Sequence, residues 1–183
     1  MTIKPGTYNL GPSDGKLQVR TGRQGMGSKM GHDLTLEASN WKATVTVDPD
    51  PAQSEVTATV EPRSLEVVAA TGGAKPVSDK DKKDIQKNIA GLLGNNSITF
   101  KSTSVKARDE NNVSVTGELS IAGQSRQVTL DLTVEPDGGT AHLKGKVPIV
   151  QSSFGVKPFS AMMGALKVKD EVEVDLDVKL PSE

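Results

Sequence analysis

The segment GRQGMGSKMG at residues 22–31 has the glycine content of a loop that binds phosphate groups. In the nucleotide-binding loop with such glycines, Lys precedes Ser or Thr, so that the amine reaches phosphate and the hydroxyl reaches magnesium. Here Ser28 precedes Lys29, and a strand-like segment follows where that loop requires a helix. We therefore interpret the segment as a glycine-rich hairpin or lid and not as a nucleotide site.

Two histidines are candidates for acid–base or metal chemistry. His142 lies between Ala141 and Leu143, which should face the core, so its side chain should point outward. A metal site needs three or four converging ligands, and the chain has neither Cys nor a closely spaced His pair, so no metal is expected. His32 follows the glycine-rich loop and can hydrogen-bond a ligand headgroup, with a capping or exposed histidine as the alternative.

The sequence offers little for catalysis. AGQSRQ at residues 122–127 lacks the spacing of a nucleophilic serine elbow and joins two strand-like segments, whereas the elbow joins a strand to a helix. Acid–base catalysis needs titratable groups inside a pocket, but the alternating segments place their charged residues on the outer face. We expect no enzyme and no cofactor. The alternative is an enzyme with His32 as acid or base and Lys157 as an electrophilic aid.

We expect β-strands to hold the candidate residues described above in place, because apolar and polar residues alternate with a period of two along most of the chain. The alternation is most regular at 113–121, 128–134 and 172–180, with weaker copies at 17–19, 41–47, 56–60, 98–100 and 143–149. Turn-forming residues gather at 48–53, 108–112, 122–125 and 136–139, which favours antiparallel hairpins. Phase breaks at 60–65 and 102–105 predict β-bulges, and Gly117 and Gly145 predict curvature.

One segment predicts a helix, over residues 79–93. Ser78 is suited to the N-cap, Asp81 follows three residues later, and Gly94 is suited to end the helix. An apolar stripe that includes Ile89 and Leu93 runs along it and needs an apolar surface to cover, such as the mouth or flank of a barrel.

The predicted fold class is all-β, with about eight antiparallel strands that close into a barrel and so remove unprotected sheet edges. We expect one domain over residues 1–183. A barrel of this size can fill its interior or hold one small ligand. Small aliphatic residues dominate the inward positions and aromatic residues are 3% of the chain, which favours a cavity.

The segment QSSFGVKPFSAMMGALKVKD at 151–170 is apolar for a loop between two strands, so something must cover it. It suits either a greasy cavity or another protein, and the alternative is ordinary core that closes one barrel end. Lys157, Lys167 and Lys169 flank it, where they meet either a phosphate or carboxylate headgroup or only solvent.

Four segments carry a resemblance to a known family: residues 31–47, 97–105, 115–132 and 151–174. The third, VTGELSIAGQSRQVTLDL, is the most specific, and the chain resembles the YceI-like, lipocalin-like polyisoprenoid-binding proteins over residues 6–180. The resemblance implies a lipocalin-like antiparallel β-barrel with an inserted helix and an apolar channel. It also implies binding of isoprenoid chains such as quinones or polyprenyl phosphates, no catalysis, and in some members a homodimer.

The expected ligand-binding residues are the large apolar side chains near this channel, together with the histidine. They are Trp41, Phe100, Phe154, Phe159, Met162, Met163, Leu166, Ile89, Leu93 and His32. The alternative from a different class is a barrel with a filled core that acts through protein contacts, with the loop at residues 151–170, the Phe/Met loop, at a homodimer seam.

Charge and hydropathy narrow the expected partners. The net charge is −1, with basic and acidic residues spread along the chain, so the basic stripe of a nucleic-acid binder is missing. No segment approaches the roughly 18 apolar residues of a membrane span. The N-terminal residues lack the apolar run of a secretion signal, so the expected location is the cytoplasm.

Overall fold

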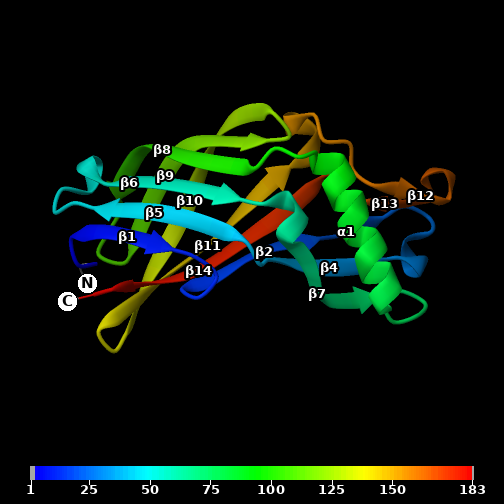
Figure 1. The fold of residues 1–183 in the computed structure, drawn as a ribbon, viewed down its shortest axis with the longest axis horizontal. Helices are drawn as coiled ribbons and strands as arrows, with labels where there is room; N and C mark the ends of the chain where they lie inside the picture. The colour runs from blue at the N-terminus through cyan, green and yellow to red at the C-terminus, as the bar shows by residue number, and fades with distance from the viewer. Residues whose placement is uncertain (1–2, 183) are drawn as a thin grey trace.

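The structure is a computed structural model that describes residues 3–182. Among these residues, eleven strands form one antiparallel sheet that curls into a half-barrel (Figure 1). The strands are β1 (Gly6–Leu10), β2 (Gly15–Thr21), β4 (His32–Ala38), β5 (Trp41–Val47), β6 (Glu55–Val60), β7 (Leu65–Gly72), β8 (Ile98–Ala107), β9 (Asn112–Ile121), β10 (Gln124–Asp137), β11 (Thr140–Val150) and β14 (Glu171–Pro181). The predicted all-β antiparallel class is confirmed.

Alternation is strongest where the strands are longest. Strands β9, β10, β11 and β14 pair in sequence order across their predicted segments. Two of the predicted turns are tight hairpins, one at Ala122 and Gly123 and one at Gly138 and Gly139, and all four residues have positive φ. Such turns match the right-handed twist of the strands that they join.

One of the two predicted β-bulges is confirmed and the other is wrong. The register between β8 and β9 shifts between Ser102 and Ser104, as the phase break indicated. At 60–65 the chain instead leaves β6, turns through the short 3-10 helix η3 (Pro62–Ser64) and enters β7 at the other edge of the sheet. Pro62 has no N–H for a strand ladder, so the strand ends before it. The sequence analysis missed a second register shift, at Thr35 and Leu36.

The helix α1 spans Asp79–Leu93, as predicted. The Ser78 and Asp81 side chains form a capping box, in which each accepts a hydrogen bond from the other residue's backbone N–H. The bond that the Asp81 carboxylate accepts from the Ser78 hydroxyl lowers the pKa of Asp81. The apolar stripe packs on the core, and the helix lies beside β7 and η3 at one end of the molecule (Figure 1).

The two edges of the main sheet, β1 and β7, are not paired with each other in the described chain. The predicted hydrogen-bonded barrel is therefore a half-barrel. The chain crosses between the two sides of the sheet at the β4–β5 turn and again between β6 and β7, and we call this part the crossing region. There Ser39 N donates to Ser64 O and Glu61 N donates to Asn40 O, both at 3.0 Å, while Ser64 is buried. These bonds tie the β4–β5 turn to η3.

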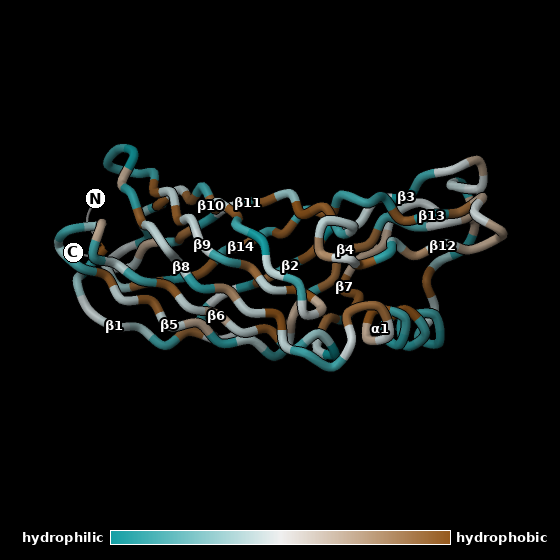
Figure 2. Tube along the Cα trace, turned by 90° about the horizontal axis from the view of Figure 1, so that it is seen from above, coloured by the Kyte–Doolittle hydropathy of each residue, from teal (hydrophilic) through white to brown (hydrophobic). Residues whose placement is uncertain are grey.

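A second, small sheet extends the half-barrel at the α1 end. It contains β12 (Ser160–Ala161), β13 (Leu166–Val168) and β3 (Arg23–Gln24), in that order. Four further 3-10 helices complete the fold: η1 (Ser28–Met30), η2 (Pro51–Gln53), η4 (Gln151–Phe154) and η5 (Met162–Gly164). The small sheet therefore joins the glycine-rich loop to the Phe/Met loop (Figure 2).

Candidate functional site

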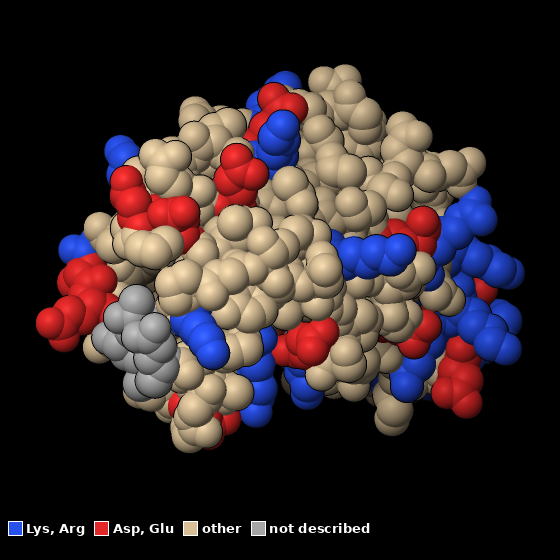
Figure 3. Space-filling view, turned by 60° about the vertical axis from the view of Figure 1, so that its left-hand side comes forward, with Lys and Arg blue, Asp and Glu red and all other residues tan. Residues whose placement is uncertain are grey.

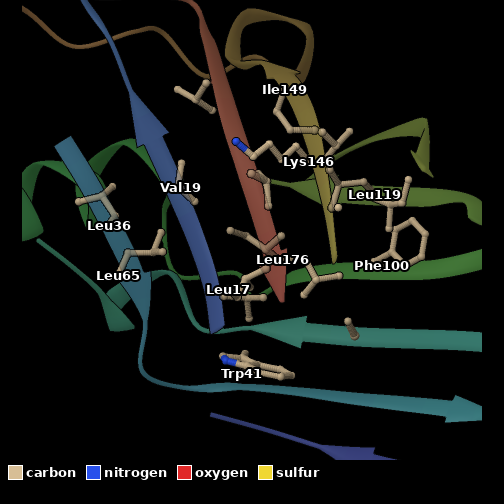
Figure 4. Close-up of a pocket in the computed structure, with 18 of the residues that line it drawn as sticks. Leu17, Val19, Leu36, Trp41, Leu65, Phe100, Leu119, Lys146, Ile149 and Leu176 are labelled. Carbon is tan, nitrogen blue, oxygen red and sulfur yellow. The ribbon is translucent and has the colours of Figure 1, made fainter. Parts of the chain in front are cut away.

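The half-barrel encloses a cavity of about 1290 Å³. This volume exceeds the roughly 300–1,000 Å³ of pockets that hold drug-sized ligands. Its wall is largely aliphatic, and the side chains come from strands on every side (Figure 4). The labelled residues are Leu17, Val19, Leu36, Trp41, Leu65, Phe100, Leu119, Lys146, Ile149 and Leu176.

Small residues at several inward positions leave part of the interior unfilled. Ala43, Ala58 and Gly145 stand at inward positions of β5, β6 and β11 and line the cavity. A Cβ on Gly145 would lie 2.8 Å from Asp131 O, so the backbone of the adjacent strand passes too closely for a larger residue there. Protein interiors are otherwise close-packed, which makes a void of this size a feature that needs an explanation.

Eight of the ten predicted ligand-binding residues line this cavity. They are Trp41, Phe100, Phe154, Phe159, Leu166, Ile89, Leu93 and His32. Phe154 is buried at the base of the Phe/Met loop, whereas Phe159 stands partly exposed at its rim. The structure does not bring Met162 and Met163 to the cavity. Both have positive φ in η5, and this turn leaves both side chains in solvent.

Polar side chains border the cavity at its ends. At the α1 end these are Arg23, His32, Lys75 and Lys167, with Asp81 and Asp84 from the helix. Arg23 is held by a 2.6 Å hydrogen bond from its Nη1 to Gly31 O. His32 Nε2 donates to the carbonyl oxygen of Lys75 at 2.7 Å, which fixes the ring at the rim and commits this nitrogen to the backbone.

The opposite end is bordered by Asp48, Asp109 and Glu110. Asp48 Oδ1 accepts a hydrogen bond from the backbone of Asp50 at 2.9 Å. Asp109 Oδ1 accepts from the backbone of Asn111, also at 2.9 Å, and this bond lowers the pKa of Asp109. These two carboxylates therefore stabilise the turns that contain them.

Two further titratable side chains, those of His142 and Lys146, lie next to carboxylates. His142 points outward as predicted, and its Nδ1 and Nε2 lie 2.6 Å and 3.3 Å from carboxylate oxygens of Asp177 and Asp137. Lys146 borders the cavity, but its ammonium pairs with exposed Glu173 at 3.4 Å. Within residues 3–182, no group of His, Asp and Glu side chains is arranged to hold a metal ion.

Sequence reasoning placed His32 and Lys167 at the cavity, but it passed over part of the cavity wall, Arg23, Lys75 and the acidic end. Leu17, Val19 and Leu36 line the interior and carry the same period-two signal as the residues that were chosen. Arg23 and Lys75 carry no such signal, because the glycine-rich loop and the chain before α1 meet only in the folded molecule. No helix in the described part of the chain combines the length and the apolar character that crossing a bilayer requires.

A family model described as a YceI-like domain matches residues 8–180. The crystal structure of BcnA from Burkholderia cenocepacia is similar, with a TM-score of 0.66, 22% identity, and coverage of 90% of this chain and 95% of BcnA. A YceI protein from Campylobacter jejuni has a TM-score of 0.56 and 15% identity, and the match covers 85% of this chain and 86% of that one. No curated protein matches the sequence.

At these identities the similar structures show the fold alone. The matched domain is known as a polyisoprenoid-binding fold and generally as a fold of binding proteins. The cavity and the family match therefore both make the interior of the half-barrel the candidate binding site.

Proposed function

The chain belongs to the family of YceI-like domains, and we propose that it is a non-catalytic carrier that holds one long isoprenoid chain inside the half-barrel. The ligand that we propose is of the quinone or polyprenyl phosphate class. The large aliphatic cavity is the observation that carries this proposal.

Burial energies support a hydrocarbon ligand with few polar contacts. Each CH₂ group removed from water contributes about 0.8 kcal/mol, so each five-carbon unit contributes several kcal/mol before the cost of ordering the chain is subtracted. The cavity wall supplies aliphatic surface from β2, β4, β11 and β14 along one side and from β5, β6 and β8 along the other. Such a site needs no directional bond to the chain itself.

The α1 end is the proposed place for the headgroup. Arg23, Lys75 and Lys167 border the cavity there and would attract a phosphate or donate to a carbonyl oxygen. The opposite end presents Asp48, Asp109 and Glu110, which would repel a phosphate. A headgroup at the α1 end would leave the chain to fill the aliphatic interior.

The alternative of a filled core that acts through protein contacts does not account for a cavity of this volume. No catalytic step is proposed, because the two candidate acid–base groups described at the α1 end, His32 and Asp81, are held in structural hydrogen bonds. His32 donates to a backbone carbonyl, and Asp81 is bound to the helix cap.

Native mass spectrometry of freshly purified protein tests the proposal, with an adduct of lipid mass as the expected result. Ala58→Phe should remove the adduct, because Ala58 lines the cavity and a phenyl ring there would occupy chain volume. Thr57→Phe is the matched control, since Thr57 is the preceding residue in β6 and faces solvent. Equal adducts in both variants, with unchanged far-UV circular dichroism, would contradict a ligand in the half-barrel.

A further inference from the structure

We propose that the α1 end of the molecule docks on an anionic lipid bilayer, so that the cavity opens against the membrane. The inference rests on the proposed function in one respect, because it names the surface through which the proposed lipid chain would enter the cavity. The docking surface consists of residues 22–33, 75–87 and 156–169, and we call it the mouth surface. All three segments border the cavity.

Large apolar side chains are exposed on the mouth surface to an unusual degree. The exposed fractions are 97% for Met26, 56% for Met30, 37% for Phe159, 57% for Met162 and 107% for Met163. Only two other large apolar residues in the described chain are comparably exposed, Val68 and Val150. Since scattered exposed residues are normal and clusters are not, this concentration indicates an interaction site.

Backbone bonds hold the two methionine-bearing loops together. Gly27 N donates to Ala165 O at 2.8 Å, and Lys169 N donates to Gly22 O at 2.7 Å. The small sheet, in which β13 pairs with both β3 and β12, adds further backbone bonds between the two loops (Figure 2). Met26 and Met163 are therefore presented from neighbouring loops at the same end of the molecule.

The backbone of η5 adopts a strained conformation that leaves the side chains of Met162 and Met163 exposed. Met162 and Met163 have φ values of 52° and 56°, in the left-handed region that residues with a Cβ rarely adopt. The turn thus holds two long apolar side chains in solvent against both backbone preference and the cost of hydration. Such outliers persist where the surrounding structure imposes them, and they gather at functional sites.

Charge identifies the partner as anionic. The mouth surface carries ten Lys and Arg against four Asp, a net charge of +6, whereas the whole chain has −1 and the rest of it therefore −7. Within the described residues, Lys29, Lys157, Lys167 and Lys169 form no ion pair. In Figure 3 blue Lys and Arg side chains are denser at the right-hand edge than over the rest of this face, with some red acidic side chains among them.

The combination of exposed methionine and unpaired lysine fits a bilayer surface. Apolar side chains enter the boundary between headgroups and acyl chains, while Lys and Arg bind anionic headgroups. A second copy that used the same surface would bring two net positive charges together, and a nucleic acid would leave the methionines in water. The bilayer is therefore the partner that satisfies both features.

The mouth surface also continues into the cavity. Met30, Phe159 and Leu166 line the cavity, and Met30 and Phe159 are exposed as well. An apolar path thus runs from the outer tip to the interior wall. Docking of this end would allow a lipid chain to pass from the bilayer into the cavity without crossing water.

Co-sedimentation of the full chain with phosphatidylcholine vesicles, with and without phosphatidylglycerol, tests the proposal. The expected result is binding that requires phosphatidylglycerol and falls about tenfold or more in the double variant Met162→Asp, Met163→Asp. Val68→Asp is the matched control, since Val68 is an exposed apolar residue on β7 outside the mouth surface. Thermal unfolding of each variant verifies that it folds.

Three results would contradict the proposal that the mouth surface docks on an anionic bilayer. These are equal binding to both vesicle types, equal binding of the methionine variant and the control, and loss of a dimer in the methionine variant with vesicle binding unchanged. Native mass spectrometry on the same samples separates the two proposals. A lipid adduct without vesicle binding would remove the docking surface alone, whereas vesicle binding without an adduct would retain it and remove the cavity ligand.

Discussion

The two ends of the half-barrel border the same cavity but differ in how their charged groups are used. At the acidic end, Asp48 and Asp109 accept hydrogen bonds from the turns that contain them. At the basic end, Lys157, Lys167 and Lys169 form no ion pair with any described residue and stand beside exposed methionines. The difference separates side chains that stabilise local structure from side chains that remain available to an external partner.

Charge reversal provides the strongest test of this contrast. Lys157→Glu, Lys167→Glu and Lys169→Glu together should weaken binding to phosphatidylglycerol vesicles about a hundredfold, because each basic residue near an anionic bilayer contributes about 1 kcal/mol. Co-sedimentation at low ionic strength measures the change. Glu55→Lys, at an exposed position near the acidic end, is the control and should change binding less than about twofold. A clear gain in binding for Glu55→Lys would mean that net charge, and not the position of the charges, governs binding.

Removing one capping side chain at each end has a smaller expected effect and compares how much each cap contributes to the free energy of unfolding. Ser78→Ala should lower the free energy of unfolding by about 1 kcal/mol, because it removes the side chain that accepts the Asp81 N–H at the start of α1. Asp50→Ala at the acidic end removes a single bond to Ala52 N from a three-residue turn and should cost less. Urea unfolding monitored by circular dichroism compares the two. If Asp50→Ala lowered the free energy of unfolding more than Ser78→Ala, the cap at the acidic end would be the more important of the two.

The pH response is the smallest expected effect, and it should be alike at both ends. Hydrogen bonds from Ser78 and from Asn111 lower the pKa of Asp81 and of Asp109 below the ordinary value of 3.8. A lowered pKa in the folded state means that the stabilisation is complete above pH 3.8 and is lost as the pH falls through the folded value. Carboxyl NMR titration should show both midpoints below 3.8. A midpoint above that value at either residue would show that its turn does not form in solution.

Local signals in the sequence predicted the elements that depend on neighbouring residues. The helix over 79–93 was predicted with both ends correct, because Ser78, Asp81 and Gly94 specify its start and its end. The long strands β9, β10 and β14 followed from alternation, since one face of each is buried. These predictions needed no information about distant segments.

The errors arose where distant segments or backbone direction decide the structure. Pro62 ended a strand where a phase break had indicated a bulge, since alternation does not register a missing N–H. The pairing of β1 with β5, which leaves the barrel open, depends on residues far apart in the chain. Composition identified Met162 and Met163 as exceptional but could not show that their turn points away from the cavity.

The crossing region has a mechanical consequence. Its two backbone bonds, between Ser39 and Ser64 and between Glu61 and Asn40, join the β4–β5 turn to η3, where the chain passes from one side of the sheet to the other. Among the described residues β1 and β7 do not pair with each other, but just before β1 the Lys4 N–H donates to Pro181 O at 3.1 Å. The crossing region thus joins the two sides of the half-barrel by main-chain hydrogen bonds that do not belong to the sheet.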